Sequence, residues 1–402
     1  GNGFMKAVMY GGGNIGRGFI GALLSQSGYE VTFIDVAEPV VKELQEKHEY
    51  PVRYVSSQGY EDVVIRNVTA VNGNDAEAAA EAIASCDIMA TAVGARILKF
   101  IIGNLVAGLR RRWARTDKPL NIIICENLMD ADVLLRQYLL AALPEDKHAL
   151  FEQTIGLVET SIGRMVPPAD PDLIPANEHP LAVRVEPYDF LPVDKAAFKG
   201  SIPEYSKIIP YEPFHYYLER KLYVHNMAHV TTAFLGKLQN KTYIHEAAQD
   251  IYIQHIVRGC MMESAMMLTQ KYRIPFHDLN AHINDLLQRF KNCYLKDTVS
   301  RVARDPIRKL QPSDRLVGAA RSCENENITP VYLSFAIALA LSFMENEDLL
   351  NLMENVCKIK REEPLAQRVT YFYNKIMVEH IPLDQIYTII DNLQSDIQGE
   401  TI

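Results

Sequence analysis

The chain has 402 residues, more than one ordinary hydrophobic core accommodates, so we expect two domains. The net charge of −9 is spread without acidic or basic blocks, which argues against a general nucleic-acid binder. No apolar run reaches the roughly 20 residues that span a bilayer, and the N-terminus lacks the layout of a signal peptide. These features predict a cytoplasmic protein with no membrane segment.

The six cysteines are scattered and form neither a Cys-x-x-Cys pair nor a metal-ligand spacing with a histidine. Reduced thiols suit this distribution. The sequence predicts no metal site.

A short apolar strand, Lys6–Tyr10, runs directly into a glycine-rich segment that is followed by a helical pattern. Gly-x-Gly-x-x-Gly between a strand and a helix is typical of dinucleotide binding. The first glycine allows a tight turn, the second lets the pyrophosphate approach, and the third lets helix and strand pack closely. The helix N-terminus presents free N–H groups to the phosphates. The predicted cofactor contacts here are Gly11, Gly13, Asn14, Ile15 and Gly16.

The next predicted strand, Glu30–Ile34, ends at Asp35, which lies 19 residues after Gly16. A carboxylate at this place accepts hydrogen bonds from the ribose hydroxyls and repels a 2′-phosphate, so it favours NAD over NADP. The alternative is a glycine-rich turn in a nucleotide-free domain, which leaves the position of Asp35 unexplained.

Further apolar strands are predicted at 62–66, 88–93 and 120–125, with helical patterns between them. Such alternation indicates an α/β class with a doubly wound, mostly parallel sheet of the Rossmann type. Ligands bind outside the carboxyl ends of such strands. We therefore expect Val93 and Gly94 to lie along the cofactor. Asn127, after its own strand, either faces the nicotinamide side or is only a turn residue.

The character of the chain changes near residue 200. Before it, late strands are predicted at 154–158 and 181–186; after it, long helical stretches dominate. We predict an NAD-binding Rossmann domain over residues 1–199 and a mainly α-helical substrate domain over residues 200–402, with the active site in the cleft between them. The predicted helices span 216–239, 244–272, 277–290, 330–344 and 349–360.

The first of these helices carries a lysine, an amide and an imidazole. At about 100° per residue, Lys221, Asn226 and His229 fall within an arc of roughly 140°. The alternative is a solvated lysine, a surface asparagine and a packed histidine. Because the surrounding run is apolar and predicts burial, we favour a chemical site.

The spacing Lys-x4-Asn-x2-His resembles the signature of the polyol-specific long-chain dehydrogenases. The resemblance implies an active site in which Lys221 is the general base, Asn226 and Asn127 donate hydrogen bonds to the reacting oxygen, and His229 orients the substrate or the lysine. Cys125-Glu-Asn-Leu128 resembles the segment that holds the family's second asparagine. To act as a base, Lys221 needs a pKa lowered by burial and nearby cations.

The family usually has Asp-Arg before an apolar pair and a proline, whereas this chain has Gly163 before Arg164, so the role of that acid is either lost or taken over by another residue. In relatives, an aspartate at the position of Asp194 borders the substrate pocket. Helix capping is the alternative for Asp194.

A basic segment follows, with five cations within 15 residues: Arg301, Arg304, Arg308, Lys309 and Arg315. A solvated, salt-bridged face is one interpretation. Because Pro306 and Pro312 interrupt any helix, the side chains can instead converge from a turn on a phosphate. Arg301 and Lys309 resemble positions of relatives that act on unphosphorylated polyols, whereas Arg304 is additional and favours a sugar phosphate, with Arg308 and Arg315 as helpers.

The resemblance implies reversible NAD-dependent oxidation of D-mannitol 1-phosphate to D-fructose 6-phosphate, without a metal. One alternative is an NAD-dependent mannitol 2-dehydrogenase or hexuronate reductase that acts on an unphosphorylated substrate. Another is a non-catalytic NAD(H)-binding sensor, which has no need of a base beside the nicotinamide. The family includes zinc-independent monomers, so we expect a monomer whose partner is a small sugar or polyol phosphate.

Overall fold

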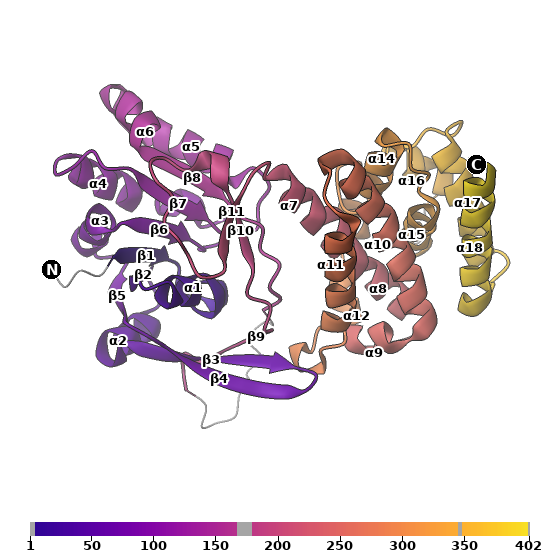
Figure 1. Cartoon of the computed structure of the whole chain (residues 1–402), viewed down its shortest axis with the longest axis horizontal. Helices are drawn as coiled ribbons and strands as arrows, with labels where there is room; N and C mark the ends of the chain where they lie inside the picture. The colour runs from indigo at the N-terminus through magenta and orange to yellow at the C-terminus, as the bar shows by residue number, and fades with distance from the viewer. Residues whose placement is uncertain (1–4, 167–178, 345–347, 401–402) are drawn as a thin grey trace. The chain divides into compact units, whose positions relative to one another are not determined.

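The computed structural model describes residues 5–166, 179–344 and 348–400. The chain forms two compact units, which we call unit 1 (Gly1–His215) and unit 2 (Tyr216–Ile402) (Figure 1). The division falls after His215 rather than after residue 199 because β11 (Ile208–Tyr211) pairs with β10 (Leu191–Asp194) of unit 1.

The main sheet of unit 1 has six strands in the order β5-β2-β1-β6-β7-β8. All of its pairings are parallel. This order is that of the Rossmann dinucleotide-binding fold, so the predicted fold class is confirmed. The strands span Lys6–Tyr10 (β1), Glu30–Asp35 (β2), Val68–Asn72 (β5), Ile88–Thr91 (β6), Leu120–Ile124 (β7) and Ile155–Glu159 (β8).

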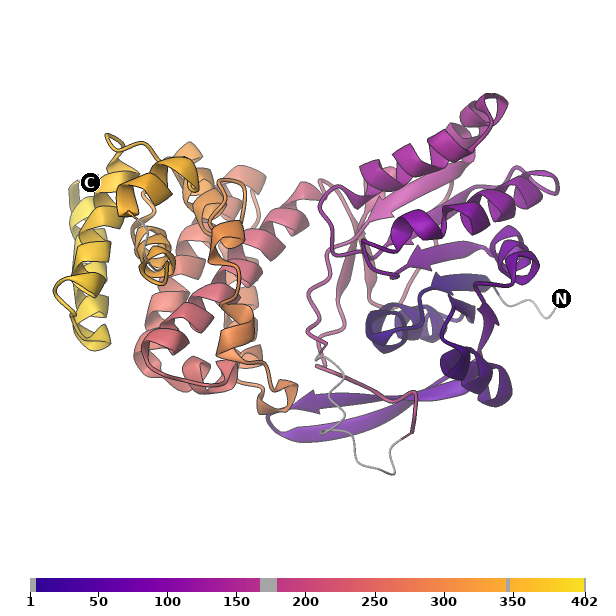
Figure 2. The same ribbon diagram turned by 180° about the vertical axis from the view of Figure 1, so that it is seen from behind.

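Helices cover both faces of this sheet (Figure 2). Strand β1 shows why, because its alternate residues enter different cores. Met9 lies in the core that contains Phe19, whereas Val8 lies in the core that contains Leu105. A strand buried on both faces reads as a continuous apolar run. The first core takes α1 (Gly21–Gln26) and α2 (Glu38–Lys47); the second takes α3 (Ala76–Ser85), α4 (Ile102–Trp113), α5 (Ala131–Ala142) and α6 (His148–Thr154).

Two predicted strands lie outside the main sheet. β4 (Gly59–Arg66), predicted at 62–66, forms an antiparallel hairpin with β3 (Glu49–Ser56), and β9 (Val183–Val185) pairs in parallel with β3. The prediction of a parallel strand at 62–66 was therefore wrong. Its apolar run suggests a buried strand, but only Ile65 of β4 is buried. The neighbouring β5 takes the place in the sheet instead.

Unit 2 is mainly helical, as predicted. The predicted helix 216–239 consists of three segments: α7 (His215–Arg220), the π-helical turn η6 (Lys221–Asn226) and α8 (Met227–Leu238). The predicted helix 244–272 breaks at Asp250, whose side chain caps the second part. The remaining helices are α9 (Ile244–Gln249), α10 (Ile251–Tyr272), α11 (Phe276–Arg289), α12 (Val299–Val302), α13 (Pro306–Lys309), α14 (Val317–Asn325), α15 (Val331–Ser342), α16 (Leu349–Asn355), α17 (Pro364–Met377) and α18 (Leu383–Glu400).

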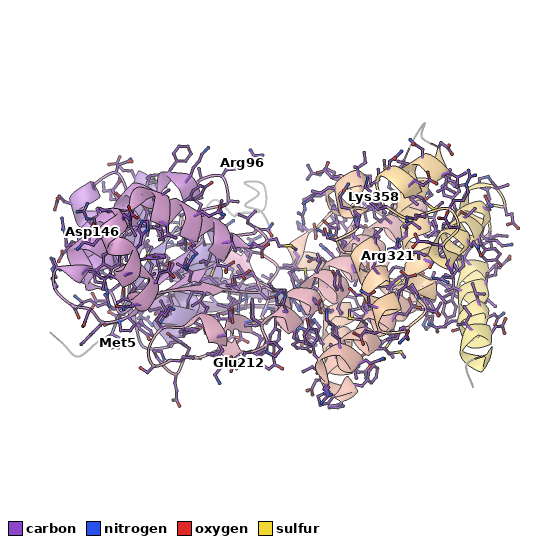
Figure 3. All side chains as sticks on the ribbon, turned by 90° about the horizontal axis from the view of Figure 1, so that it is seen from above. Met5, Arg96, Asp146, Glu212, Arg321 and Lys358 are labelled. Atoms are coloured by element: carbon purple, nitrogen blue, oxygen red, sulfur yellow. The ribbon has the colours of Figure 1, made fainter. Side chains whose placement is uncertain are left out.

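The core of unit 2 forms around α10 and α15. Every residue of α15 from Val331 to Leu341 is buried, and the helix packs against α10, α17 and α18. At its start, Glu263 of α10 accepts hydrogen bonds from the N–H groups of residues 331–333. At the periphery, Arg321 donates to the carbonyl of Lys358 at 3.1 Å and pairs with Glu363 at 2.8 Å; Arg321 and Lys358 are labelled in Figure 3.

Candidate active site

The glycine loop of unit 1 lies at the carboxyl end of β1. Gly11 has a φ of +110°, and a Cβ on it would lie 2.3 Å from the carbonyl oxygen of Ala92. A Cβ on Gly16 would lie 2.0 Å from the carbonyl oxygen of Gly11. At Gly13, by contrast, no described atom lies within 4 Å of such a Cβ. The loop therefore tolerates only glycine at two positions and leaves open space at the third, which fits a pyrophosphate at the following helix N-terminus, Asn14 and Ile15.

Asp35 is fixed beside this loop. Its Oδ2 accepts a hydrogen bond from the Gly12 N–H at 2.7 Å, and its Oδ1 accepts one from the Ala37 N–H at 2.8 Å. Each carboxylate oxygen keeps a second lone pair for a ribose hydroxyl. The negative charge at the end of β2 fits NAD.

Arg17 is buried beside the glycine loop and was not among the predicted site residues. Its side chain is 7% exposed and donates to the carbonyl oxygens of Gly12 and Leu181. Burial lowers its pKa below the ordinary value. An arginine one position after the last glycine of the motif, in an otherwise apolar run, was the available signal.

The segment after β6 is held by a carboxylate from the end of β7. Glu126 is buried, and its side chain accepts hydrogen bonds from the N–H groups of Val93, at 3.1 Å, and Gly94, at 2.8 Å. These two amides are therefore bound to protein, and the predicted contact of this segment with the cofactor stays a prediction. The neighbouring Asn127 is exposed.

Arg164 is buried beside Gly163. It donates to the carbonyl oxygens of Gly18, at 2.8 Å, and of Tyr188, while one terminal nitrogen has no hydrogen-bond partner among the described residues. Burial lowers its pKa, and the charges of Asp189 and Glu186 oppose that shift. These carboxylates are the candidates for the acid that the family usually has at position 163. Pro167, the proline of that motif, lies outside the described residues.

Asp194 caps a short 3₁₀ turn, since its Oδ1 accepts the Ala196 N–H at 3.1 Å. The capping interpretation is confirmed, and its contact with substrate stays a prediction. Burial and the charges of Asp132 and Glu212 raise its pKa.

Three carboxylates of unit 1, Asp130, Asp132 and Glu159, bring oxygens within 4.8 Å of one another. Burial and the charge of Asp132 raise the pKa of Glu159 to about 8. Oxygen ligands of this kind suit Mg²⁺ or Ca²⁺. Partly exposed acidic groups are common without an ion, and we propose no metal here.

In unit 2, the predicted catalytic lysine and asparagine are the first and last residues of the π-helical turn η6. The sequence prediction assumed α-helical spacing, which places the two side chains about 140° apart around the helix axis. In a π turn the hydrogen bonds run from residue i to i+5, so this turn departs from that spacing. Both are partly buried. Lys221 Nζ lies 3.4 Å from Nδ1 of His225.

His229 belongs to a hydrogen-bonded chain that the sequence analysis missed in part. Its Nε2 lies 2.9 Å from Oδ2 of Asp297, and the Oδ1 of Asp297 accepts a hydrogen bond from Nε of Arg301 at 2.9 Å. Burial alone raises the pKa of Asp297, but the hydrogen bond and charge of His229 and the charge of Arg301 outweigh it, so the pKa is lowered. Arg301 is thus linked through Asp297 to His229 and also belongs to the basic segment.

The predicted interruption of the basic segment is confirmed, because α12 and α13 are separate and Asp305 between them has a φ of +54°. Lys309 is buried and donates to the carbonyl oxygen of Val302. Burial and the charges of Arg315 and Arg308 lower its pKa to about 8. Arg304 and Arg308 are exposed. The cations thus gather around a turn.

These observations define the class. A Rossmann unit whose glycine loop and acidic strand end fit NAD, and a helical unit that carries lysine, asparagine and histidine together, are the parts of an NAD-dependent dehydrogenase. Within the described parts of the chain, no helix is both long and apolar enough to cross a membrane.

Residues 5–207 match the mannitol dehydrogenase Rossmann domain, and residues 214–370 match the mannitol dehydrogenase C-terminal domain. The chain belongs to the mannitol dehydrogenase family. It is 38% identical over 380 residues to a mannitol-1-phosphate 5-dehydrogenase of Shouchella clausii, covering 91% of this chain and 99% of that one. It is 39% identical over 358 residues to the enzyme of the same name from Thermoanaerobacter pseudethanolicus, covering 89% of each.

Solved structures share the fold. A substrate-free D-sorbitol dehydrogenase superposes with a TM-score of 0.79 at 16% identity and covers 93% of this chain and 94% of that one. Mannitol 2-dehydrogenase of Pseudomonas fluorescens, in complex with NAD and D-mannitol, gives 0.67 at 15% identity and covers 98% and 95%.

Proposed function

We propose that this protein catalyses the reversible NAD-dependent oxidation of D-mannitol 1-phosphate to D-fructose 6-phosphate. The observation that carries the proposal is the near full-length identity of 38–39% to relatives that bear the name mannitol-1-phosphate 5-dehydrogenase. The lysine, asparagine and histidine of unit 2 support the chemistry. The basic segment around Lys309 supports a phosphorylated substrate.

Lys221 is the proposed general base. Oxidation of a secondary alcohol requires that the hydroxyl proton leaves as the hydride departs, and NAD, when bound, accepts that hydride. Asn226 donates to the oxygen on which charge develops, and Asn127 keeps its proposed role as a second donor. In the reverse direction the Lys221 ammonium returns the proton.

His229 is proposed to orient the substrate. Because its Nε2 faces the Asp297 carboxylate, the proton of the neutral ring resides on that nitrogen. Nδ1 then accepts a hydrogen bond from a substrate hydroxyl. A carboxylate on one ring nitrogen fixes the tautomer and the orientation of the imidazole, as in other catalytic histidines.

Arg301, Arg304, Arg308, Lys309 and Arg315 form the proposed phosphate site. Arginine offers paired donors to phosphate oxygens, and lysine offers a point charge. Arg304 is exposed, and the structure gives it a hydrogen bond of 3.4 Å to the carbonyl of Arg301, so its guanidinium retains donors for an anion.

The test compares NADH oxidation by D-fructose 6-phosphate with NADH oxidation by fructose, for the wild type and for Arg304→Ala. We expect a strong preference for the phosphate that shrinks in the variant. Arg361→Ala, which removes another exposed arginine of unit 2, is the matched control and should retain the preference. Equal or faster turnover of fructose by the wild type would assign the protein to unphosphorylated polyols.

The alternative hypothesis, a non-catalytic NAD(H)-binding sensor, leads to a different expected result. If Lys221 is the base, Lys221→Ala binds NADH as the wild type does and loses turnover. A wild-type protein that binds NADH but turns over no polyol or ketose would favour the sensor.

We further infer a metal-independent monomer in the cytoplasm. Turnover unchanged by EDTA and a light-scattering mass near 45.4 kDa would support this inference.

A further inference from the structure

His225 lies in the same π-helical turn as Lys221 and Asn226, but it has no place in the Lys-x4-Asn-x2-His spacing. Its side chain is 3% exposed. Burying a polar ring costs free energy unless its nitrogens find partners. What His225 contacts therefore decides what it does.

The polar contact of His225 is with the predicted base. Its Nδ1 lies 3.4 Å from Nζ of Lys221. The two residues are four positions apart, so their side chains lie on the same side of the helix. At 3.4 Å this is a long hydrogen bond.

Basic groups surround this imidazole. They are Lys221 on its own turn, His229 on α8, and His282 and Arg289 on α11. Burial, followed by these neighbours, holds the pKa of His225 well below its ordinary value. The ring is therefore neutral above the ordinary pKa of a histidine. With the proton on Nε2, Nδ1 then has a lone pair directed at the lysine.

Aromatic rings fix the orientation of His225. The Phe290 ring is tilted against it with centroids 6.1 Å apart, and the His229 ring meets it edge-on at 6.4 Å. Phe290 also stacks on His229 at 5.4 Å. The Phe290 ring therefore packs against both imidazoles.

We propose that His225 is a positioning residue whose Nδ1 accepts one N–H of Lys221 and so aims the lone pair of the amine at the substrate hydroxyl. This inference rests on the proposed role of Lys221. During oxidation the neutral amine, with two hydrogens, takes the hydroxyl proton while the hydride leaves the same carbon for the nicotinamide. The resulting ammonium keeps one N–H on His225 and directs the new one to the ketone oxygen. His225 neither gains nor loses a proton.

The test is the pH profile of kcat for polyol phosphate oxidation in His225→Leu and His225→Asn. Leucine fills a similar volume without an acceptor, whereas the Oδ1 of asparagine takes the place of Nδ1. Without the acceptor, the Lys221 ammonium loses a stabilising contact, so its pKa falls. We expect His225→Leu to lower kcat about 10- to 100-fold and to shift the acidic limb of the profile down by about half a unit to one unit, with KM little changed. His225→Asn should restore both.

His255→Leu is the control, because it replaces another histidine of the same unit, whose ring stacks on Tyr387 with centroids 5.1 Å apart and which is not among the groups that surround His225. It should leave the acidic limb in place. If His225→Leu shows no cooperative melting transition, and so is not folded, His225→Asn is compared with His225→Gln instead. Glutamine carries its amide to the position of Nε2, so only the asparagine variant should keep the acidic limb of the kcat profile at the wild-type pH.

The outcomes distinguish failure of the positioning role of His225 from failure of Lys221 as the base. An unshifted acidic limb in His225→Leu, at any kcat, would overturn the positioning role while leaving Lys221 as the base. Turnover retained by Lys221→Ala would instead overturn the proposed base itself.

Discussion

Nε2 of His229 and Oδ2 of Asp297 lie 2.9 Å apart although 68 residues separate them in the chain. The carboxylate also pairs with Arg301, so it is held from two sides. This arrangement ties the helix that carries the predicted catalytic residues to the start of the basic segment. The proposed orientation of the substrate therefore depends on a residue that the Lys-x4-Asn-x2-His spacing does not include.

Asp297→Asn should lower kcat about 10- to 100-fold. An amide in place of the carboxylate weakens the hydrogen bond and allows the other tautomer of His229, which disorients the ring. Steady-state kinetics with NADH and D-fructose 6-phosphate checks this. NADH affinity, measured by fluorescence titration, should stay as in the wild type, because the cofactor loop belongs to unit 1. Wild-type kcat in the variant would contradict the role.

Asp35→Ser should change the cofactor preference. The carboxylate at the end of β2 accepts the Gly12 and Ala37 N–H groups and repels a 2′-phosphate. Serine removes the charge, so kcat/KM for NADPH relative to NADH should rise by roughly tenfold or more. An unchanged ratio would mean that another group excludes the phosphate.

Glu159→Gln should stabilise the protein at alkaline pH. Burial and the charge of Asp132 raise the pKa of Glu159 to about 8, so the folded state binds its proton more tightly than the unfolded state does. Wild-type stability therefore falls as pH rises from the ordinary carboxyl range through about 8. Melting temperatures in EDTA, at pH 5 and pH 8.5, check this. The variant should melt at a higher temperature than the wild type only at pH 8.5. Equal melting temperatures at both pH values would contradict the raised pKa of Glu159.

Glu263 should make the stability of unit 2 pH-dependent. Burial raises its pKa to about 7 despite hydrogen bonds from the N–H groups of residues 331–333 and from Gln394. Because the folded pKa is raised, the wild type loses stability as pH rises through about 7, whereas Glu263→Gln does not titrate. The melting-temperature difference between wild type and this variant should therefore shrink from pH 5 to pH 8.

Glu263→Ala is the companion variant. It leaves the buried donors unpaired and opens a cavity, so at pH 5 it should lower the free energy of unfolding by about 2–5 kcal/mol. Chemical denaturation measures it. A difference for Glu263→Gln that widens with pH would show that the four donors keep the carboxylate ionised in the folded protein.

The Rossmann half of the fold was predictable because its signals are local. The glycine spacing, the strand before it and Asp35 after the next strand fix the cofactor half of the site within about 30 residues. The β3–β4 hairpin was not predictable in the same way. The apolar run 63–65 has the composition of a buried strand, and only the three-dimensional structure shows that two of its residues are not buried.

In unit 2, periodicity located the helices but not their irregularity. No sequence pattern distinguishes a π turn at Lys221–Asn226 from an α-helical one, because both keep an apolar face. Asp297 was missed for a different reason, since a carboxylate 68 residues from its histidine has no spacing to recognise. The break between α12 and α13 was predictable from Pro306. The two interdomain expectations, the cleft and the role of Asn127, stay predictions.

Glu263 also has a consequence for how the chain is made. Its backbone donors lie 68 to 70 residues further along, and Gln394 lies 131 residues further. On the ribosome, α10 therefore emerges about 70 residues before α15 supplies these backbone donors, and Gln394 follows only near the end of the chain. In unit 1, by contrast, the glycine loop, the sheet and Glu126 all lie within the first 215 residues. Because α15 packs against α17 and α18 as well as α10, all parts of the unit 2 core are present only once the last helices have been synthesised.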